Sequence, residues 1–285
     1  MYADDTKLLA KIDPNSPIPD SEVLQSDINK INEWTRVWLM ELNSSKCKIM
    51  HIGKRNPNHK YYIFDPKTNK NIEMSTCITE RDLGVIISSD LKCSAHVNSA
   101  TCKANRMFGL LRKTFVSRDI NISKSLYTTY IRPLIEFSVC VWNPYTSKDI
   151  VKLEKVQRRV SKIIFGLKNK SYPDRCASLN ITSLAERRTR GALIQKFKFE
   201  NKMDEIHWYT QPISVQVRNG QKIRYRREIV RMCNQRHNFF NNRIANSWNS
   251  LADEIKNSTS VNNFKNTSDK MDKTTATGRH LTRSV

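Results

Sequence analysis

The chain has 285 residues, with 49 Lys and Arg against 27 Asp and Glu and a formal net charge of +22. This excess goes beyond what solubility requires and indicates a polyanionic partner, nucleic acid first and an anionic membrane surface second. The length fits one large or two small domains, and 38% hydrophobic residues with only 7 Gly and 9 Pro argue against low-complexity disorder over most of the chain.

The charge is unevenly distributed along the sequence. Residues 1–50 hold 6 Lys and Arg against 8 Asp and Glu, whereas residues 151–200 hold 13 against 4. Residues 51–150 hold 15 against 8, and residues 201–285 hold 15 against 7. The acidic start and the basic remainder predict a metal site first and a polyanion-binding surface later.

The cysteines and the hydropathy pattern bear on the compartment. The chain has 7 Cys, an odd number without a CxxC pair, which argues against a zinc knuckle and favours free thiols in a reducing compartment. No run approaches the length of an apolar membrane span, and the first residues lack the basic and apolar parts of a signal peptide. We therefore expect an intracellular protein, cytoplasmic or nuclear, without a membrane partner.

The first elements predicted in chain order form a small α+β region. Residues 2–12 read as two strands joined by a tight turn at Asp4-Asp5. A helix capped by Asp20 or Ser21 follows, because apolar residues recur there at helical spacing. The residues of this apolar stripe are Leu24, Ile28, Ile31, Trp34 and Trp38. The two tryptophans, like Trp142 further along the chain, are expected to be core residues. Short strands at 46–52, 61–64, 71–74 and 83–87 then predict an antiparallel meander.

Helical periodicity dominates after residue 89. The pattern predicts helices over 93–115, over 121–142 with a break at Pro133, and over 147–167 with a stop at Gly166. Further helices are expected over 183–203 and 238–256, with an irregular basic stretch at 204–235. The tail from about 266 is rich in Asn, Thr, Ser and Lys and is predicted to be disordered.

Asp4 and Asp5 are the strongest candidates for chemistry. Adjacent carboxylates repel each other, so a pair held at a turn between strands is costly unless a cation neutralises it. Mg²⁺ prefers such hard oxygen ligands and is commonly shared with substrate phosphates. The alternative is an ordinary solvated turn. The preceding Tyr2-Ala3 and the apolar run that follows favour the metal site.

The stretch Tyr2-Ala3-Asp4-Asp5-Thr6-Lys7-Leu8 resembles the [FY]ADDTKL form of the YxDD motif in reverse transcriptases of non-LTR retrotransposons, the jockey/LINE type. The resemblance continues in order to about residue 265 and corresponds to the family patterns LQxDL, NxxKC, DLGV, RPxLEY, LExVQRR, ERRxRGxLI and WN. The matching residues are Leu24-Gln25-Ser26-Asp27, Asn43-Ser44-Ser45-Lys46-Cys47, Asp82-Leu83-Gly84-Val85, Arg132-Pro133-Leu134-Ile135-Glu136, Leu153 to Arg159, Glu186 to Ile194 and Trp248-Asn249.

The resemblance implies an α+β fold with a truncated palm over 1–90, a mostly helical thumb over 91–200, a basic helical extension over 201–265 and a tail over 266–285. The implied parent reaction is Mg²⁺-dependent transfer of a nucleotide from a dNTP to a DNA primer on an RNA template. Asp4 and Asp5 would bind the metal, and Lys46 would lie near the triphosphate. Gly84 would lie in the hairpin that grips the primer, where a glycine lets the backbone approach closely.

In that family another metal-binding carboxylate and the fingers precede the YxDD turn, and this chain starts inside the motif. We therefore expect a fragment that does not catalyse polymerisation by itself. Two alternatives stay open at this point. One is a non-catalytic nucleic-acid-binding protein derived from a retroelement thumb, and the other is a relic gene product without a stable fold.

Three basic clusters are candidates for contact with an RNA template, a DNA primer or a hybrid duplex. The first is a stripe on the predicted helix 147–167, where cations gather beside the apolar arc. The alternative for each cluster is a solvated basic face, and for Tyr225, which lies in the third, it is packing rather than base stacking. The clusters are Lys148, Lys152, Lys155, Arg159 and Lys162; Arg187, Arg188 and Arg190; and Arg224, Arg226 and Arg227.

Overall fold

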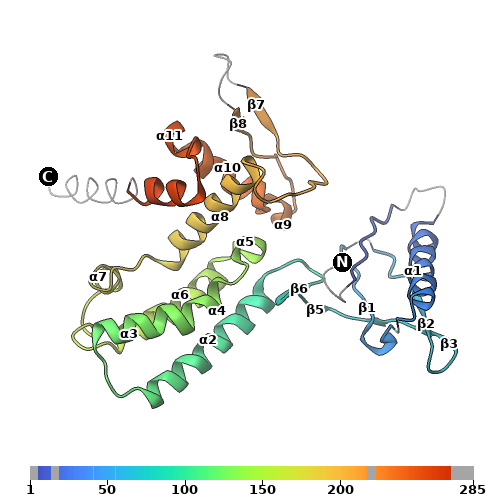
Figure 1. Cartoon of the computed structure of the whole chain (residues 1–285), viewed down its shortest axis with the longest axis horizontal. Coiled ribbons are helices and arrows are strands. Elements are labelled where there is room, and N and C mark those ends of the chain that lie inside the picture. The colour runs from blue at the N-terminus through green and yellow to red at the C-terminus, as the bar shows by residue number, and fades with distance from the viewer. Residues whose placement is uncertain (1–5, 14–18, 41, 55, 217–222, 271–285) are drawn as a thin grey trace. The chain divides into compact units, whose positions relative to one another are not determined.

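The computed structural model describes residues 6–13, 19–40, 42–54, 56–216 and 223–270 (Figure 1). The chain divides into two compact units, Met1–Lys92 and Cys93–Val285. The first combines one helix with short strands, and the second is mostly helical. This confirms the α+β class at the level of secondary structure. No described helix is long and apolar enough to cross a membrane.

The first unit is organised around α1 (Asp20–Val37) and the hairpin of β2 (Tyr62–Asp65) with β3 (Lys70–Glu73). Its small core contains Ile28, as the helical periodicity predicts, together with Ile63 of β2. The Gln25 side chain donates to the Tyr62 carbonyl at 2.8 Å and accepts from the Tyr62 N–H at 2.8 Å. The side-chain amide of Gln25 on α1 thus satisfies the backbone N–H and carbonyl of Tyr62 on β2, as a neighbouring strand would.

The remaining strands of this unit form separate pairs instead of the predicted meander. β1 (Lys48–Ile49) pairs in parallel with β4 (Ser75–Thr76), after a 3₁₀ turn at Ser44–Lys46. β5 (Thr79–Asp82) and β6 (Val85–Ser88) form a second hairpin. Its two-residue turn places Leu83 at φ 44° and Gly84 at φ 87°, the left-handed conformation that such turns require.

Two further predictions for this unit are wrong. Residues 6–13 form no strand, because none of the described strands pairs with them, and Leu9 is 82% exposed. Trp34 and Trp38 contact each other at 6.2 Å between ring centroids with their planes tilted by 42°, but they are 44% and 63% exposed. Only Trp142, in the second unit, is a core residue as predicted, at 3% exposed.

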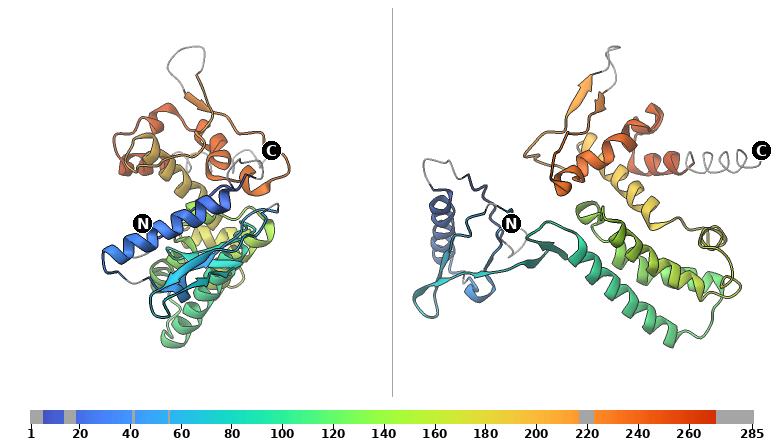
Figure 2. Two further views of the ribbon diagram at one scale, coloured as in Figure 1. Left: turned by 90° about the vertical axis from the view of Figure 1, so that its right-hand side faces the viewer. Right: turned by 180° about the vertical axis from the view of Figure 1, so that it is seen from behind.

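The second unit begins with helices that lie alongside one another in every view (Figures 1 and 2). The predicted helix 121–142 is divided by a π-helical turn at Tyr127–Ile131 and by Ser138, whose φ is 51°. Pro133 does not break the helix, because it lies in the first turn of the segment that follows the π-helical turn, where no N–H is required. The predicted helix 147–167 ends early, and a short helix follows that periodicity did not reveal. The helices are α2 (Ser94–Thr114), α3 (Ile120–Leu126), α4 (Arg132–Glu136), α5 (Val139–Trp142), α6 (Ser147–Lys162), α7 (Tyr172–Ser178) and α8 (Leu184–Glu200).

The C-terminal part of this unit packs on α8. Its core includes Phe197 and Phe264, whose rings stack at 4.6 Å between centroids, and Trp248 stacks on Phe264. Residues 261–270 are helical, so the disordered tail predicted from about 266 is wrong for 266–270, where Asp269 pairs with Arg190; its remainder lies outside the described residues. The other elements are β7 (Ser214–Gln216), β8 (Ile223–Tyr225), α9 (Asn234–His237), α10 (Phe240–Asn249) and α11 (Asp253–Lys256).

Candidate nucleic-acid interface

Helices α2 and α6 run parallel and are joined by polar contacts along their seam. Ser94 Oγ donates to Asp149 Oδ2 at 2.6 Å near the start of both helices. One turn further, Lys152 Nζ donates to Asn98, and a heptad beyond that Arg159 donates to Asn105 Oδ1 at 2.7 Å. The contacts of Lys152 and Arg159 are seven residues apart on each helix, which is about 10.5 Å along the axis. The seam therefore holds two of the predicted nucleic-acid-binding cations in fixed positions.

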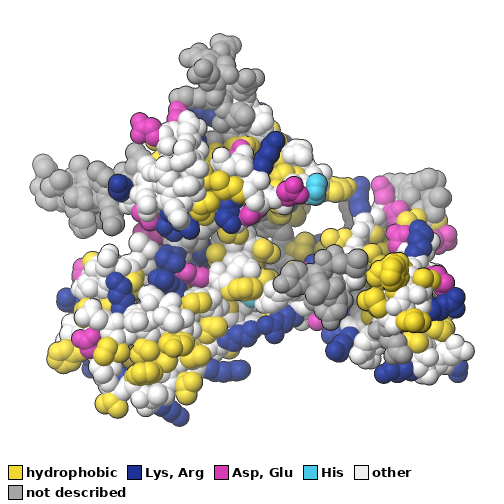
Figure 3. Space-filling view, viewed as in Figure 1, with side chains coloured by type: hydrophobic (Ala, Val, Ile, Leu, Met, Phe, Trp, Pro, Cys, Tyr) yellow, Lys and Arg dark blue, Asp and Glu magenta, His cyan; other side chains and the backbone are white. Residues whose placement is uncertain are grey.

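The solvent side of this helix pair carries cations without exposed carboxylates. α2 contains no Asp or Glu, and the two acidic residues of α6, Asp149 and Glu154, are buried. Lys and Arg side chains follow α2 along the lower edge of the unit in Figure 3. A surface of one sign suits a phosphate backbone. We define the α2–α6 face by Arg106, Lys113, Lys148, Lys152, Lys155, Arg159 and Lys162.

The arginines of the second predicted cluster interact with other parts of the protein and are not free on the surface. Arg187 forms a bidentate pair with Glu136, with 2.8 Å between Nη2 and Oε2, and Arg190 pairs with Asp269 through both carboxylate oxygens at 2.6 and 2.8 Å. Arg188 is only 5% exposed, and burial lowers the pKa of its guanidinium. Contact with nucleic acid through these arginines stays a prediction. It would require Arg187 and Arg190 to give up their carboxylate partners and Arg188 to leave the protein interior.

The Arg187–Glu136 pair supports a stability prediction. We expect Arg187→Ala to destabilise the helical unit by about 2 kcal/mol, because the half-buried Glu136 carboxylate loses a two-point partner. Thermal unfolding should shift down by roughly 4–8 °C. Arg187→Lys should recover only part of this loss, since an ammonium cannot form the fork. An unchanged melting temperature together with weaker nucleic-acid binding would instead give Arg187 the predicted binding role.

The third cluster is divided by the structure. Arg224 and Arg226 are exposed, whereas Arg227 Nη2 lies 2.8 Å from His237 Nε2. Tyr225 packs against the buried Lys196, whose Nζ lies 3.6 Å from the centre of its ring, and its hydroxyl donates to Glu200 at 2.6 Å. The structure therefore assigns Tyr225 to packing, the alternative raised from the sequence.

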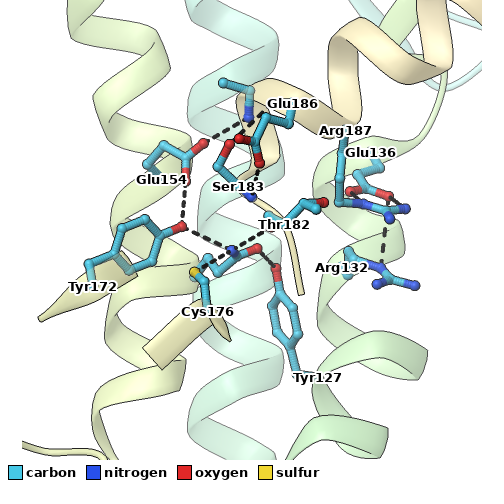
Figure 4. A network of polar contacts seen from close by, with 12 residues as sticks. Tyr127, Arg132, Glu136, Glu154, Tyr172, Cys176, Thr182, Ser183, Glu186 and Arg187 are labelled. Carbon is cyan, nitrogen blue, oxygen red and sulfur yellow. Dashed lines mark hydrogen bonds and ion pairs between the residues drawn. The ribbon is translucent and has the colours of Figure 1, made fainter. Parts of the chain in front are cut away.

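A buried polar network joins the helices beneath the α2–α6 face (Figure 4). Gln157, 1% exposed, accepts from the Tyr127 hydroxyl at 2.5 Å and donates to the Tyr172 hydroxyl at 2.9 Å and to the Thr182 carbonyl at 3.0 Å. Glu154 accepts from Tyr172 at 2.7 Å and from the N–H of Ala185 at 2.9 Å. Burial raises the pKa of both phenols, so they remain neutral donors.

Sequence reasoning assigned no role to this network. A signal was present, because Gln157 and Glu154 lie on the apolar side of α6, beside Leu153 and Val160. A polar residue within an apolar arc predicts a buried hydrogen-bonded group. The network connects α6, α7, the start of α8 and the π-helical turn. Each of its hydrogen bonds joins a side chain of one of these elements to a polar group of another. The network therefore ties α6, which carries part of the basic face, to these neighbouring elements.

The predicted catalytic residues lie in the first unit. Asp4 and Asp5 lie outside the described residues, so the predicted Mg²⁺ site does too. Within the described ranges, no group of three or more His, Cys, Asp and Glu could hold a metal ion. Lys46 is exposed at the end of its 3₁₀ turn, and Gly84 is half-buried in the β5–β6 turn. Catalytic roles for Lys46 and Gly84 therefore stay predictions.

The comparisons with known proteins find a partial match to a curated protein and no family. No family model and no solved structure matches the chain. A Caenorhabditis elegans protein described as "Uncharacterized protein B0403.1" is 29% identical over 114 residues. The aligned region covers 38% of this chain and 56% of that protein, so the chain spans just over half the length of its curated relative.

Proposed function

We propose that the helical unit binds the backbone of nucleic acid through the α2–α6 face. The observation that carries this proposal is the absence of exposed carboxylates from both helices, beside seven cations of which two are held in place by Asn98 and Asn105. A row of cations fixed along parallel helices can neutralise successive phosphates and release their counterions.

We further propose that the chain is the C-terminal part of a non-LTR retrotransposon reverse transcriptase. The ordered resemblance from Tyr2 to about residue 265 supports this origin. The parent activity would be Mg²⁺-dependent, RNA-directed DNA synthesis, with Asp4 and Asp5 as metal ligands, Lys46 near the incoming dNTP and Gly84 near the primer. In that assembly the helical unit would hold the template–primer hybrid.

The binding proposal is tested by neutralising three exposed lysines of α6. The variant Lys148→Gln/Lys155→Gln/Lys162→Gln should bind an RNA–DNA hybrid roughly 100-fold more weakly at 0.1 M salt, since each lost phosphate contact removes a released counterion. The slope of log K against log salt should become shallower by about 2.7. Fluorescence anisotropy with a labelled 20-base-pair hybrid measures both quantities.

A matched control separates the location of the charge from its amount. Lys11→Gln/Lys54→Gln/Lys70→Gln removes the same number of exposed cations from the first unit and should change affinity by less than threefold. Asp4→Ala/Asp5→Ala should leave binding unchanged, because a metal site serves the reaction and not the grip on the backbone. If the α6 variant and the control variant weaken binding equally, the α2–α6 face is not the binding surface.

A further inference from the structure

The hairpin of β7 and β8 has two chemically different sides. Its register pairs Ser214 with Tyr225 and Val215 with Arg224, and the Arg226 N–H donates to the Ile213 carbonyl at 2.9 Å, which extends the ladder by one residue. Opposite residues of antiparallel strands share a face, and neighbours along a strand alternate. Ile213, Val215, Arg224 and Arg226 therefore share one side, and Ser214 and Tyr225 share the other.

The inner side is fixed to the helices below it. Tyr225 lies over the Lys196 ammonium and donates to Glu200, both on α8. Asn249 of α10 donates to the Tyr225 carbonyl at 2.7 Å and accepts from its N–H at 3.0 Å. Asn242, one heptad earlier on α10, accepts from the Glu228 N–H at 2.8 Å. Because these contacts hold the inner side of the hairpin against α8 and α10, its outer side faces away from these helices.

The outer side is exposed and positively charged. Ile213 and Val215 are 45% and 48% exposed, and Arg224 and Arg226 are exposed and have no hydrogen-bond or ion-pair partner in the described part of the chain. Two neighbouring arginines are instead held by internal contacts, since Arg227 meets His237 and Arg236 pairs with Glu228. The outer side is thus a two-stranded ribbon with free guanidinium groups between half-exposed β-branched side chains.

We propose that this outer side enters the major groove of double-stranded DNA. The major groove of B-form DNA admits a two-stranded ribbon, arginine forms bidentate hydrogen bonds with guanine there, and apolar side chains contact the thymine methyl group. The deep and narrow major groove of A-form RNA excludes such a ribbon. The inference extends the proposed nucleic-acid binding, but it concerns a different surface from the α2–α6 face.

Two double variants of the full chain test the proposal. Arg224→Ala/Arg226→Ala should lower affinity for a 20-base-pair DNA duplex roughly tenfold or more and change affinity for an RNA duplex of the same sequence less than twofold. Arg224→Lys/Arg226→Lys keeps the charge but loses the planar fork, so it should lose most of the same affinity. The control Arg227→Ala/Arg236→Ala removes two internally paired arginines and should affect both duplexes equally and weakly.

The outcomes separate this inference from the proposed function. If the alanine variant loses affinity equally for DNA and RNA duplexes, or if the lysine variant binds DNA as tightly as the parent chain, the arginines contribute only charge attraction. Either result would overturn the groove proposal. Unchanged DNA binding by the alanine variant would also overturn it. If the alanine variant loses DNA selectively while the α6 lysine variant binds the hybrid normally, the ribbon is established and the α2–α6 face is refuted. Circular dichroism melting confirms that each variant is folded.

Discussion

Replacing Gln157 with leucine is expected to lower the melting temperature of the helical unit by roughly 10 °C. The substitution keeps the volume of the side chain but leaves the Tyr127 hydroxyl and the Thr182 carbonyl without their partner. Each buried polar group left unsatisfied costs about 1–3 kcal/mol, so we expect a total loss of about 3–4 kcal/mol. Differential scanning calorimetry of the full chain measures the change.

Gln211→Leu is the matched control, because it makes the same chemical change at an exposed position and should shift the melting temperature by less than about 1 °C. Tyr127→Phe removes only one member of the pair and should cost less than Gln157→Leu. A melting temperature of Gln157→Leu equal to that of the parent chain would show that the network does not hold these helices together. A parent chain without a cooperative transition would favour the relic interpretation.

Phe197→Ala is expected to detach the C-terminal helix from α8. Phe197 is fully buried and stacks on Phe264, which in turn stacks on Trp248. Removing a buried phenylalanine ring from such a core costs about 3–5 kcal/mol. Amide hydrogen exchange should accelerate most in residues 261–270, because their main apolar anchor, Phe264, loses its partner.

Phe165→Ala provides the comparison, since Phe165 is 84% exposed and its removal leaves no cavity. Its exchange pattern and melting temperature should match those of the parent chain. Uniform acceleration across the whole helical unit in Phe197→Ala would indicate that the aromatic stack supports the entire unit and not the C-terminal helix in particular. Unchanged exchange in 261–270 would show that Asp269 and Arg190 suffice to hold it.

The sequence by itself determined the long helices. Apolar spacing located α2, α6 and α8 to within a few residues, except at the end of α6, and it identified Leu153, Val156 and Val160 as core residues. These helices are specified locally, since a stripe repeating every few residues fixes both the element and its buried side. The excess of cations on α6 was equally readable, because Lys148, Lys155 and Lys162 lie on the polar arc of the same pattern.

Only the tertiary structure decided which cations remain free. Arg187 and Arg190 appeared equivalent to the lysines of α6, but carboxylates 51 and 79 residues away in the sequence hold them. The β7–β8 hairpin likewise depends on Asn249 and Glu200, which sequence spacing does not connect to it. Conversely, the predicted strand in residues 6–12 did not form, because a strand exists only where another pairs with it. Periodicity reports which side of an element is buried, whereas the partner of a charge or a backbone group is set by the packing of distant segments.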